Sequence, residues 1–368
     1  MNKVLTNIAG TFLIQADASF LNGAGLGEGE DRNVTIPKTF QDGKDRVPYV
    51  SSQAWKRWLR NTCLEENSNW PKSELKAIGL SEKGTANKIS GELNPVECPE
   101  DDIFGYMKAE KGQGKTKNEV DESEDSEELS QDKKSKKNKT KSVMRTSPFA
   151  ASLLVSIRKS GWRGRDEGFV HLQEGTPLPY TTEFYNAHMQ GVFSLCYERL
   201  GVFSNLGDRI ELEEEKVEKF IRSNNLKIVN DMGELGKVYE VEPNSRKDRA
   251  SALLKALAVL RGGAKQAQFG TDVSPKVLIL AGLNCGNPIF NHIFNDAKEG
   301  PEIKIDTLKE IIKDYSDRLV TPVYLGIRKG YLKNEEDVNA LNNTQENNVK
   351  IIVNTPIDAA QKMAGELQ

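Results

Sequence analysis

Three cations lie close behind a predicted helix start, where they could hold a phosphate chain. The helix is predicted to begin at Ser51 or Ser52, because a serine side chain accepts hydrogen bonds from the first backbone N–H groups of a helix. Lys56, Arg57 and Arg60 follow shortly after it. A helix start offers free N–H groups and the positive end of the helix dipole, and nearby cations add charge. The segment is therefore a candidate site for a nucleic-acid backbone.

The same segment also fits an ordinary amphipathic helix. Ala54, Trp55, Trp58 and Leu59 recur at helical spacing and would pack on a core, which leaves the cations as a solvated face. These residues alone do not decide between the two interpretations.

A glycine-rich loop at residues 22–29 follows a predicted strand at residues 4–18. Its glycines resemble a dinucleotide-binding fingerprint, but that fingerprint must open a helix. Residues 30–37 are instead polar and β-branched and end in proline, so we reject it. Asn22 and Gly23 belong either to a plain surface loop or to a loop whose bare backbone approaches phosphates.

A second glycine loop follows a predicted helix at residues 249–261. Gly262 and Gly263 would end that helix, and Lys265 and Gln266 come directly after them. The alternatives are a simple helix cap and a contact with phosphate or sugar.

A basic and aromatic hairpin tip is predicted at residues 158–165, between strands at residues 148–157 and 182–199. Trp162 and Arg163 lie in this tip. Such a loop could lie against unpaired nucleic acid, with bases or sugars on the tryptophan and phosphates on the arginines. The alternative is a solvated tip with the tryptophan folded back onto the body.

The bulk composition limits the function. The 368 residues suffice for one large domain or for two, and the formal net charge of −3 means that any nucleic-acid site is a local patch. The four cysteines and three histidines lack the spacing of disulfides or of a metal site, so we predict reduced thiols, no zinc and no cofactor. No segment approaches the length of a membrane helix, and we predict a cytoplasmic protein.

The main elements follow the order strand, helix, strand, hairpin, strand, helix, strand. This βαββαβ order predicts an α+β fold with a ferredoxin-like sheet, as in an RNA-recognition motif. A short helix is expected at residues 73–78, and the charged run at residues 110–142 is predicted to be disordered. The third strand, at residues 190–195, lacks the aromatic signature with which such motifs stack bases, so any RNA must be bound by the loops and the basic helix.

These features together resemble the DevR-type branch of the CRISPR-associated Cas seven family, the repeated backbone subunit of Cascade-type (type I) complexes, of subtype I-B. Each motif alone is weak, but they occur in the right order over most of the chain. The resembling segments are the first strand with Asn22-Gly23, residues 49–54 with Lys56 and Arg60, residues 102–107, residues 145–148, residues 190–193, and residues 262–266 with Ser274-Pro275.

The resemblance implies a modified RNA-recognition palm (residues 1–56, 145–158 and 186–288), a helical finger insertion (57–144), a thumb hairpin (159–185) and a C-terminal elaboration (289–368). It implies that copies stack along the spacer of a CRISPR RNA and grip its backbone, while base pairing reads the target DNA strand. The implied partners are the guide RNA, other copies of this chain, and the repeat-handle-binding, large and small Cascade subunits. The implied RNA contacts are Asn22, Gly23, Ser51, Ser52, Lys56, Arg57, Arg60, Arg145, Trp162, Arg163, Lys265 and Gln266.

Two other functions compete with RNA binding alone. Relatives in type III complexes cut target RNA with an aspartate in the loop after the first strand, and this chain has Asp31 there and Asp17 at the strand end. A lone aspartate is weak support for metal-assisted cleavage, so we expect no enzymatic activity. A regulatory or structural protein that purifies free of nucleic acid is the third possibility.

Overall fold

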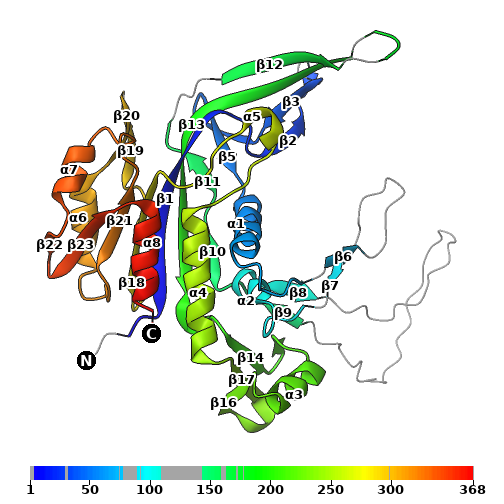
Figure 1. Cartoon of the computed structure of the whole chain (residues 1–368), viewed down its shortest axis with the longest axis vertical. Helices are drawn as coiled ribbons and strands as arrows, with labels where there is room; N and C mark the ends of the chain where they lie inside the picture. Colours follow the sequence, from blue (N-terminus) through cyan, green and yellow to red (C-terminus); the bar gives the residue numbers. More distant parts are fainter. Residues whose placement is uncertain are drawn as a thin grey trace, which may run out of the picture.

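The computed structural model describes residues 4–29, 32–73, 75–77, 89–91, 93–108, 143–158, 163–170, 173–176, 178–297 and 299–367. Asp31, Trp162 and the charged run at residues 110–142 lie outside these ranges. The molecule is elongated around one long central sheet (Figure 1).

The central sheet has the strand order expected from the sequence. Its middle strands are β1 (Asn7–Ser19), β13 (Leu178–Cys196), β18 (Val277–Leu283), β10 (Phe149–Ala151) and β11 (Leu154–Ser156). β1 pairs antiparallel with both β13 and β18, and β11 pairs antiparallel with β13, giving the order β18-β1-β13-β11. In the sheet, β13 lies between β1 and β11, and β1 lies between β13 and β18. In the chain, α1 (Ser52–Glu66) lies between β1 and β11, and α4 (Pro243–Ala258) lies between β13 and β18. The predicted α+β fold with βαββαβ order is confirmed.

One face of this sheet carries the helices. α1, α4 and the C-terminal α8 (Pro356–Gly365) pack there around a core of buried side chains. The Trp55 ring meets the rings of Phe12 and Phe149 edge-on, and its indole N–H donates to the Ser152 carbonyl at 2.8 Å. Trp55 is therefore the core anchor of α1, as its helical spacing predicts.

The C-terminal part of the chain extends this sheet and covers its opposite face. β21 (Val323–Ile327), β23 (Val349–Asn354) and β22 (Gln345–Glu346) continue the sheet beyond β18. The opposite face is covered by β19 (Phe294–Ala297), β20 (Gly300–Ile303), α6 (Ile305–Asp314) and α7 (Glu335–Ala340). A second core joins Leu13 of β1 and Ile279 of β18 to Leu308 and Ile312 of α6. The sheet face on which an ordinary RNA-recognition motif stacks bases is thus covered over β1 and β18, in keeping with the missing aromatic signature.

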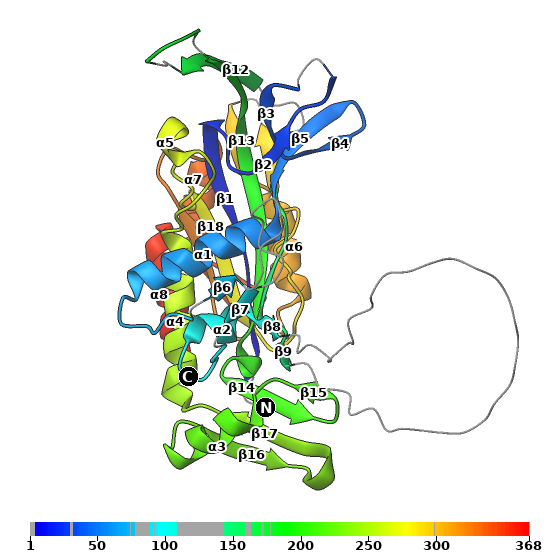
Figure 2. The ribbon, with the colours of Figure 1, turned by 90° about the vertical axis from the view of Figure 1, so that its right-hand side faces the viewer.

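A smaller body lies at one end of the molecule (Figure 2). Its six-stranded sheet contains β8 (Tyr106–Lys108), β9 (Val143–Arg145), β14 (Val202–Leu206), β15 (Arg209–Ile210), β16 (Lys227–Asp231) and β17 (Gly236–Glu240). α3 (Glu214–Arg222) covers it, and Phe203, Phe220 and Tyr239 form its own core. Near it are α2 (Pro99–Phe104) and the single turns η2 (Tyr197–Arg199) and η3 (Gly233–Leu235).

The opposite end carries a hairpin. β12 (Arg163–Val170) pairs with the first part of β13, and the strands around it are β2 (Gly23–Leu26), β3 (Val34–Pro37), β4 (Thr39–Asp42) and β5 (Asp45–Val50). β2 pairs with β3, so the glycine-rich loop leads into strands and opens no helix. The rejection of a dinucleotide fingerprint is confirmed.

The helix expected at residues 73–78 was a wrong prediction. The structure has a strand there, β6 (Leu75–Ala77), which pairs with β7 (Ile89–Gly91). A six-residue helix leaves its first four N–H groups without partners inside the helix, whereas a paired strand satisfies backbone groups through its neighbour.

His188 of β13 is expected to make the stability of the fold sensitive to acid. Its Nδ1 lies 2.9 Å from the Tyr331 hydroxyl, and burial lowers its pKa below the ordinary 6.5, with Asp296, Arg158 and Asp17 nearby. As the pH falls through 6.5, the unfolded chain gains a proton that folded His188 does not take up, so stability should fall there. His188→Gln should flatten this part of the profile in urea midpoints measured at about pH 7.5 and 5.5. The exposed His292, replaced by asparagine, is the matched control, and a profile unchanged in His188→Gln would refute this role.

Candidate nucleic-acid interface

Asn22 joins the loop after β1 to the start of α1. Its side-chain oxygen accepts a hydrogen bond from the Ser51 backbone N–H at 3.1 Å, and its carbonyl accepts one from the Lys38 N–H at 2.8 Å. Ser51 is the N-cap residue, but its side chain makes no capping bond, so the predicted cap position is confirmed without its side-chain contact. Gly23 and Ser52 consequently lie close together, although Asn22 and Ser51 are 29 positions apart in the sequence.

The loop after α4 packs against the end of β1. Gly262 lies flat on the Trp58 ring, where a Cβ would come within 2.3 Å of the indole, so only glycine fits. The Ala264 N–H donates to the Leu21 carbonyl at 2.9 Å. The Gln266 amide donates within its own loop, to the Thr271 carbonyl at 3.1 Å. Three segments far apart in the sequence therefore meet, but the Gln266 side chain shapes the loop rather than pointing out of it.

Lys265 is held in place at this meeting point. Its backbone is left-handed (φ 52°), and α5 (Gln266–Phe269) begins directly after it. The ammonium donates to the Thr182 hydroxyl of β13 at 2.5 Å and lies 5.2 Å from the centre of the Phe20 ring. An ammonium has three N–H donors, so this contact leaves others for an anion.

A groove of about 560 Å³ runs beside α1. Its lining residues are Gln53, Lys56, Arg57, Arg60, Asn61, Leu64, Lys72, Ser73, Glu100, Phe104 and Gly105. Arg57 and Lys72 are exposed in it. Lys72 is not predictable from the sequence, because it lies beyond the helix and no local spacing relates it to Arg57.

The two cations that the sequence most favoured are engaged inside the protein. Lys56 donates to the Ser147 hydroxyl and the Phe149 carbonyl, each at 3.0 Å, and burial lowers its pKa. Arg60 is ion-paired with Glu100 at 3.0 Å and with Asp101 at 3.3 Å. Both line the groove, but much of their hydrogen-bonding capacity and charge is already used.

Arg145 was expected to contact RNA, but it lies in the protein interior. Its side chain is fully buried, donates to Asp102 and pairs with Glu211 at 3.2 Å. The guanidinium also lies on the Phe203 ring. A group enclosed in this way has no access to a phosphate, so we leave Arg145 out of the interface.

Residues 158–165 were predicted to form the tip of the hairpin but do not, because Arg163 begins β12 opposite Tyr185 and the chain turns between Val170 and Leu178. The hairpin contributes one described candidate. Arg163 is partly exposed and donates to the Arg46 carbonyl at 2.7 Å, which fixes it beside a second arginine. The pKa of Arg163 is lowered, mainly by burial and to a smaller extent by the positive charge of the nearby Arg46. Arg163 of the hairpin and Arg46 of β5 are therefore neighbouring cations.

The fold and these cations define a βαββαβ protein with a candidate surface for nucleic acid. The profile of the family described as CRISPR-associated negative auto-regulator DevR/Csa2 matches residues 92–299, more than half of the chain. The chain belongs to this family.

Two solved structures are similar in fold to this chain. A chain of a structure described as CRISPR RNA-guided surveillance complex, pre-nicking, is 10% identical, with a TM-score of 0.54 over 98% of this chain and 100% of that one. A chain of another CRISPR RNA-guided surveillance complex is 12% identical, with a TM-score of 0.50 over 98% and 99%. At these identities the likeness shows the fold alone. No curated protein sequence matches this chain.

Proposed function

We propose that this protein binds CRISPR guide RNA by its backbone, whatever the sequence, as the repeated subunit of a type I (I-B) Cascade filament. The observation that carries the proposal is the convergence of Asn22, the α1 start and Lys265, continued along α1 by Arg57 and Lys72. Family membership and the kind of complex that contains the structural relatives support it.

Gripping the backbone leaves the bases free. Cations and backbone N–H groups recognise phosphates without reading sequence, and the guide then selects the target DNA strand by base pairing. The protein supplies position and charge and, in this proposal, no chemistry. Its other partners are further copies of itself and the repeat-handle-binding, large and small subunits of the complex.

The cleavage alternative rests on two aspartates. Asp31 lies outside the described residues, and Asp17 is exposed, with the Gln15 amide 2.5 Å from its carboxylate. Among the described residues no group of three or more His, Cys, Asp and Glu side chains is arranged to hold a metal ion.

No described helix is both long enough and apolar enough to cross a membrane.

Binding of single-stranded RNA tests the proposal. Two RNAs of equal length and unrelated sequence should bind with dissociation constants within about twofold of each other, and affinity should fall steeply with salt. Fluorescence anisotropy with both RNAs, over a range of salt concentrations, measures this. A strong preference for one sequence would contradict backbone binding. Failure to bind either RNA would favour the regulatory alternative, which also fits the family's description as an auto-regulator.

A further inference from the structure

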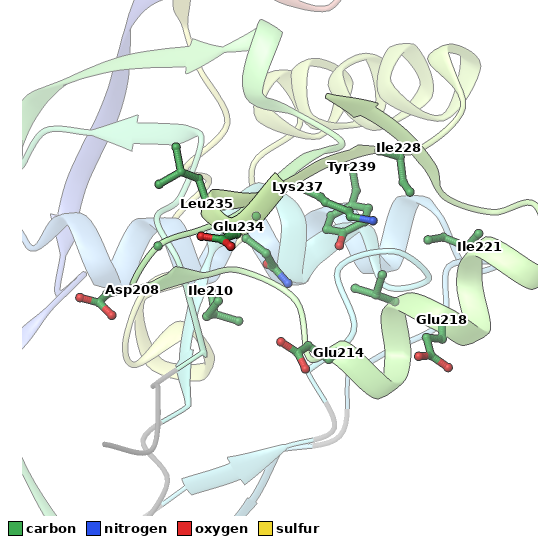
Figure 3. Close-up of a pocket in the computed structure, with 14 residues that line it drawn as sticks. Asp208, Ile210, Glu214, Glu218, Ile221, Ile228, Glu234, Leu235, Lys237 and Tyr239 are labelled. Carbon is green, nitrogen blue, oxygen red and sulfur yellow. The ribbon is translucent and has the colours of Figure 1, made fainter. Parts of the chain in front are cut away.

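The small body formed by α3 and β14–β17 carries a groove that the RNA surface does not use. Its volume is about 560 Å³ (Figure 3). Its apolar lining consists of Ile210, Val217, Ile221, Ile228, Leu235 and Tyr239. Leu235 is 63% exposed and Ile228 is 44% exposed, which is unusual for large aliphatic side chains that lie in one groove.

An open sheet edge borders this groove. β16 is the last strand of its sheet, pairs only with β17, and all five of its residues are exposed. Val229 within it is 50% exposed, and Met232 just after it is 47% exposed. An exposed edge strand with apolar side chains invites another polypeptide segment to pair or pack beside it.

The rim of the groove is acidic. Four lining residues are acidic, Asp208, Glu214, Glu218 and Glu234, and one, Lys237, is basic. Lys237 is itself paired with Asp231 at 3.1 Å, and Glu218 is paired with Arg222 at 3.1 Å. In Figure 3, Glu214 and Glu218 project from α3 across from the strands that carry Ile228 and Tyr239. This charge would repel an RNA backbone and attract a cationic partner.

We propose that this groove, the acidic groove, binds a basic and partly apolar segment of a different polypeptide. Apolar side chains of that segment would cover Ile228 and Leu235, and its lysines or arginines would face Glu214 and Glu234. A second copy of this chain is a poorer fit, because the chain as a whole carries a net charge of −3. The identification of the partner as another subunit of the complex rests on the proposed function. The groove and its acidic rim are observed independently of that function.

Photo-crosslinking in the purified complex tests this. A photoreactive benzoylphenylalanine at position 235 should crosslink to a Lys/Arg-rich segment of another subunit, identified by mass spectrometry. The same residue at position 153 is the matched control, because Leu153 is 43% exposed, lies between β10 and β11 and does not line the groove. Glu214→Lys with Glu234→Lys should lower the crosslink yield roughly tenfold, because it replaces two attractions by repulsions. Glu310→Lys with Asp314→Lys on α6 makes the same change of charge elsewhere and should leave the yield unchanged.

Each other outcome overturns the proposal. These outcomes are a crosslink to RNA, to a second copy, to an acidic or uncharged segment, or to this chain's own lysine-rich residues 133–141, whose deletion would then remove the product. An unchanged yield in the Glu214/Glu234 variant, or no crosslink at position 235, does so as well. RNA affinity measured on the same variants should stay constant, so a failure of this inference is distinguishable from a failure of the proposed function.

Discussion

Reversing the charges of Arg57 and Lys72 together is expected to weaken RNA binding roughly ten- to a hundredfold at low salt. Both side chains are exposed in the groove beside α1, so the substitutions to glutamate disturb no described internal contact. Each phosphate contact releases counterions from the RNA on binding, so a variant that loses a contact releases fewer of them. The slope of log affinity against log salt should therefore become shallower by about two. Anisotropy titrations at several salt concentrations measure both effects.

The control must carry the same change in net charge. Lys313→Glu with Lys350→Glu places two reversals on exposed positions of the C-terminal elements, away from α1. This variant should shift affinity only slightly, and its salt slope should stay that of the original protein. Equal losses in the two variants would mean that RNA responds to net charge alone, and the groove would not be a site.

Replacing Asp102 with alanine is expected to have the largest effect on stability, a loss of about 3–5 kcal/mol. Asp102 is fully buried and accepts hydrogen bonds from Arg145, from Arg249 at 2.6 Å, and from the Gly201 N–H at 2.8 Å. The alanine variant leaves two guanidinium groups buried without their shared anion. A typical domain is stable by only about 5–15 kcal/mol, so the variant should unfold at much lower urea.

An exposed ion pair is the comparison for this loss. Glu218 and Arg222 of α3 are 75% and 81% exposed, and Glu218→Ala should change stability by no more than about 0.5 kcal/mol. Asp102→Asn, which keeps one acceptor oxygen, should lie between the two variants. A urea midpoint for Asp102→Ala close to that of Glu218→Ala would show that the buried network contributes no more to stability than an exposed ion pair.

Asp102 also explains two of the family-like segments. Residues 102–107 and 145–148 meet through the Asp102 and Arg145 side chains. Gly105 has φ 71°, and a Cβ there would lie 2.5 Å from the Arg145 carbonyl oxygen, so only glycine fits. These residues are thus required by the architecture, and their recurrence as a motif carries no implication of RNA contact.

Elements with a strong period were predictable from the sequence. The strand predicted at residues 4–18 is β1 (Asn7–Ser19), and Trp55 occupies the core as its spacing requires. Both depend on neighbours within a few residues. By contrast, the burial of Arg145 was not predictable, because its partners Asp102 and Glu211 are 43 and 66 residues away in the sequence.

The sequence predicted which segments form the candidate site, but not which of their cationic side chains remain available to bind RNA. Glycine-broken loops and a capped basic helix were recognisable from the residues, and the sheet brings them together. Which cations stay available depends on tertiary partners. Lys56 meets Ser147, 91 residues on, and Arg60 meets Glu100, 40 residues on. No periodicity within a single helix carries that information.

The stoichiometry of protein on RNA tests the central claim most directly. Native mass spectrometry of the purified protein with single-stranded RNAs of increasing length would count the copies bound to each RNA. A backbone-gripping filament subunit predicts that copies increase in regular steps with RNA length, and that two unrelated sequences of one length carry the same number. A copy number that stays constant as the RNA lengthens, or that depends on sequence at fixed length, would contradict it.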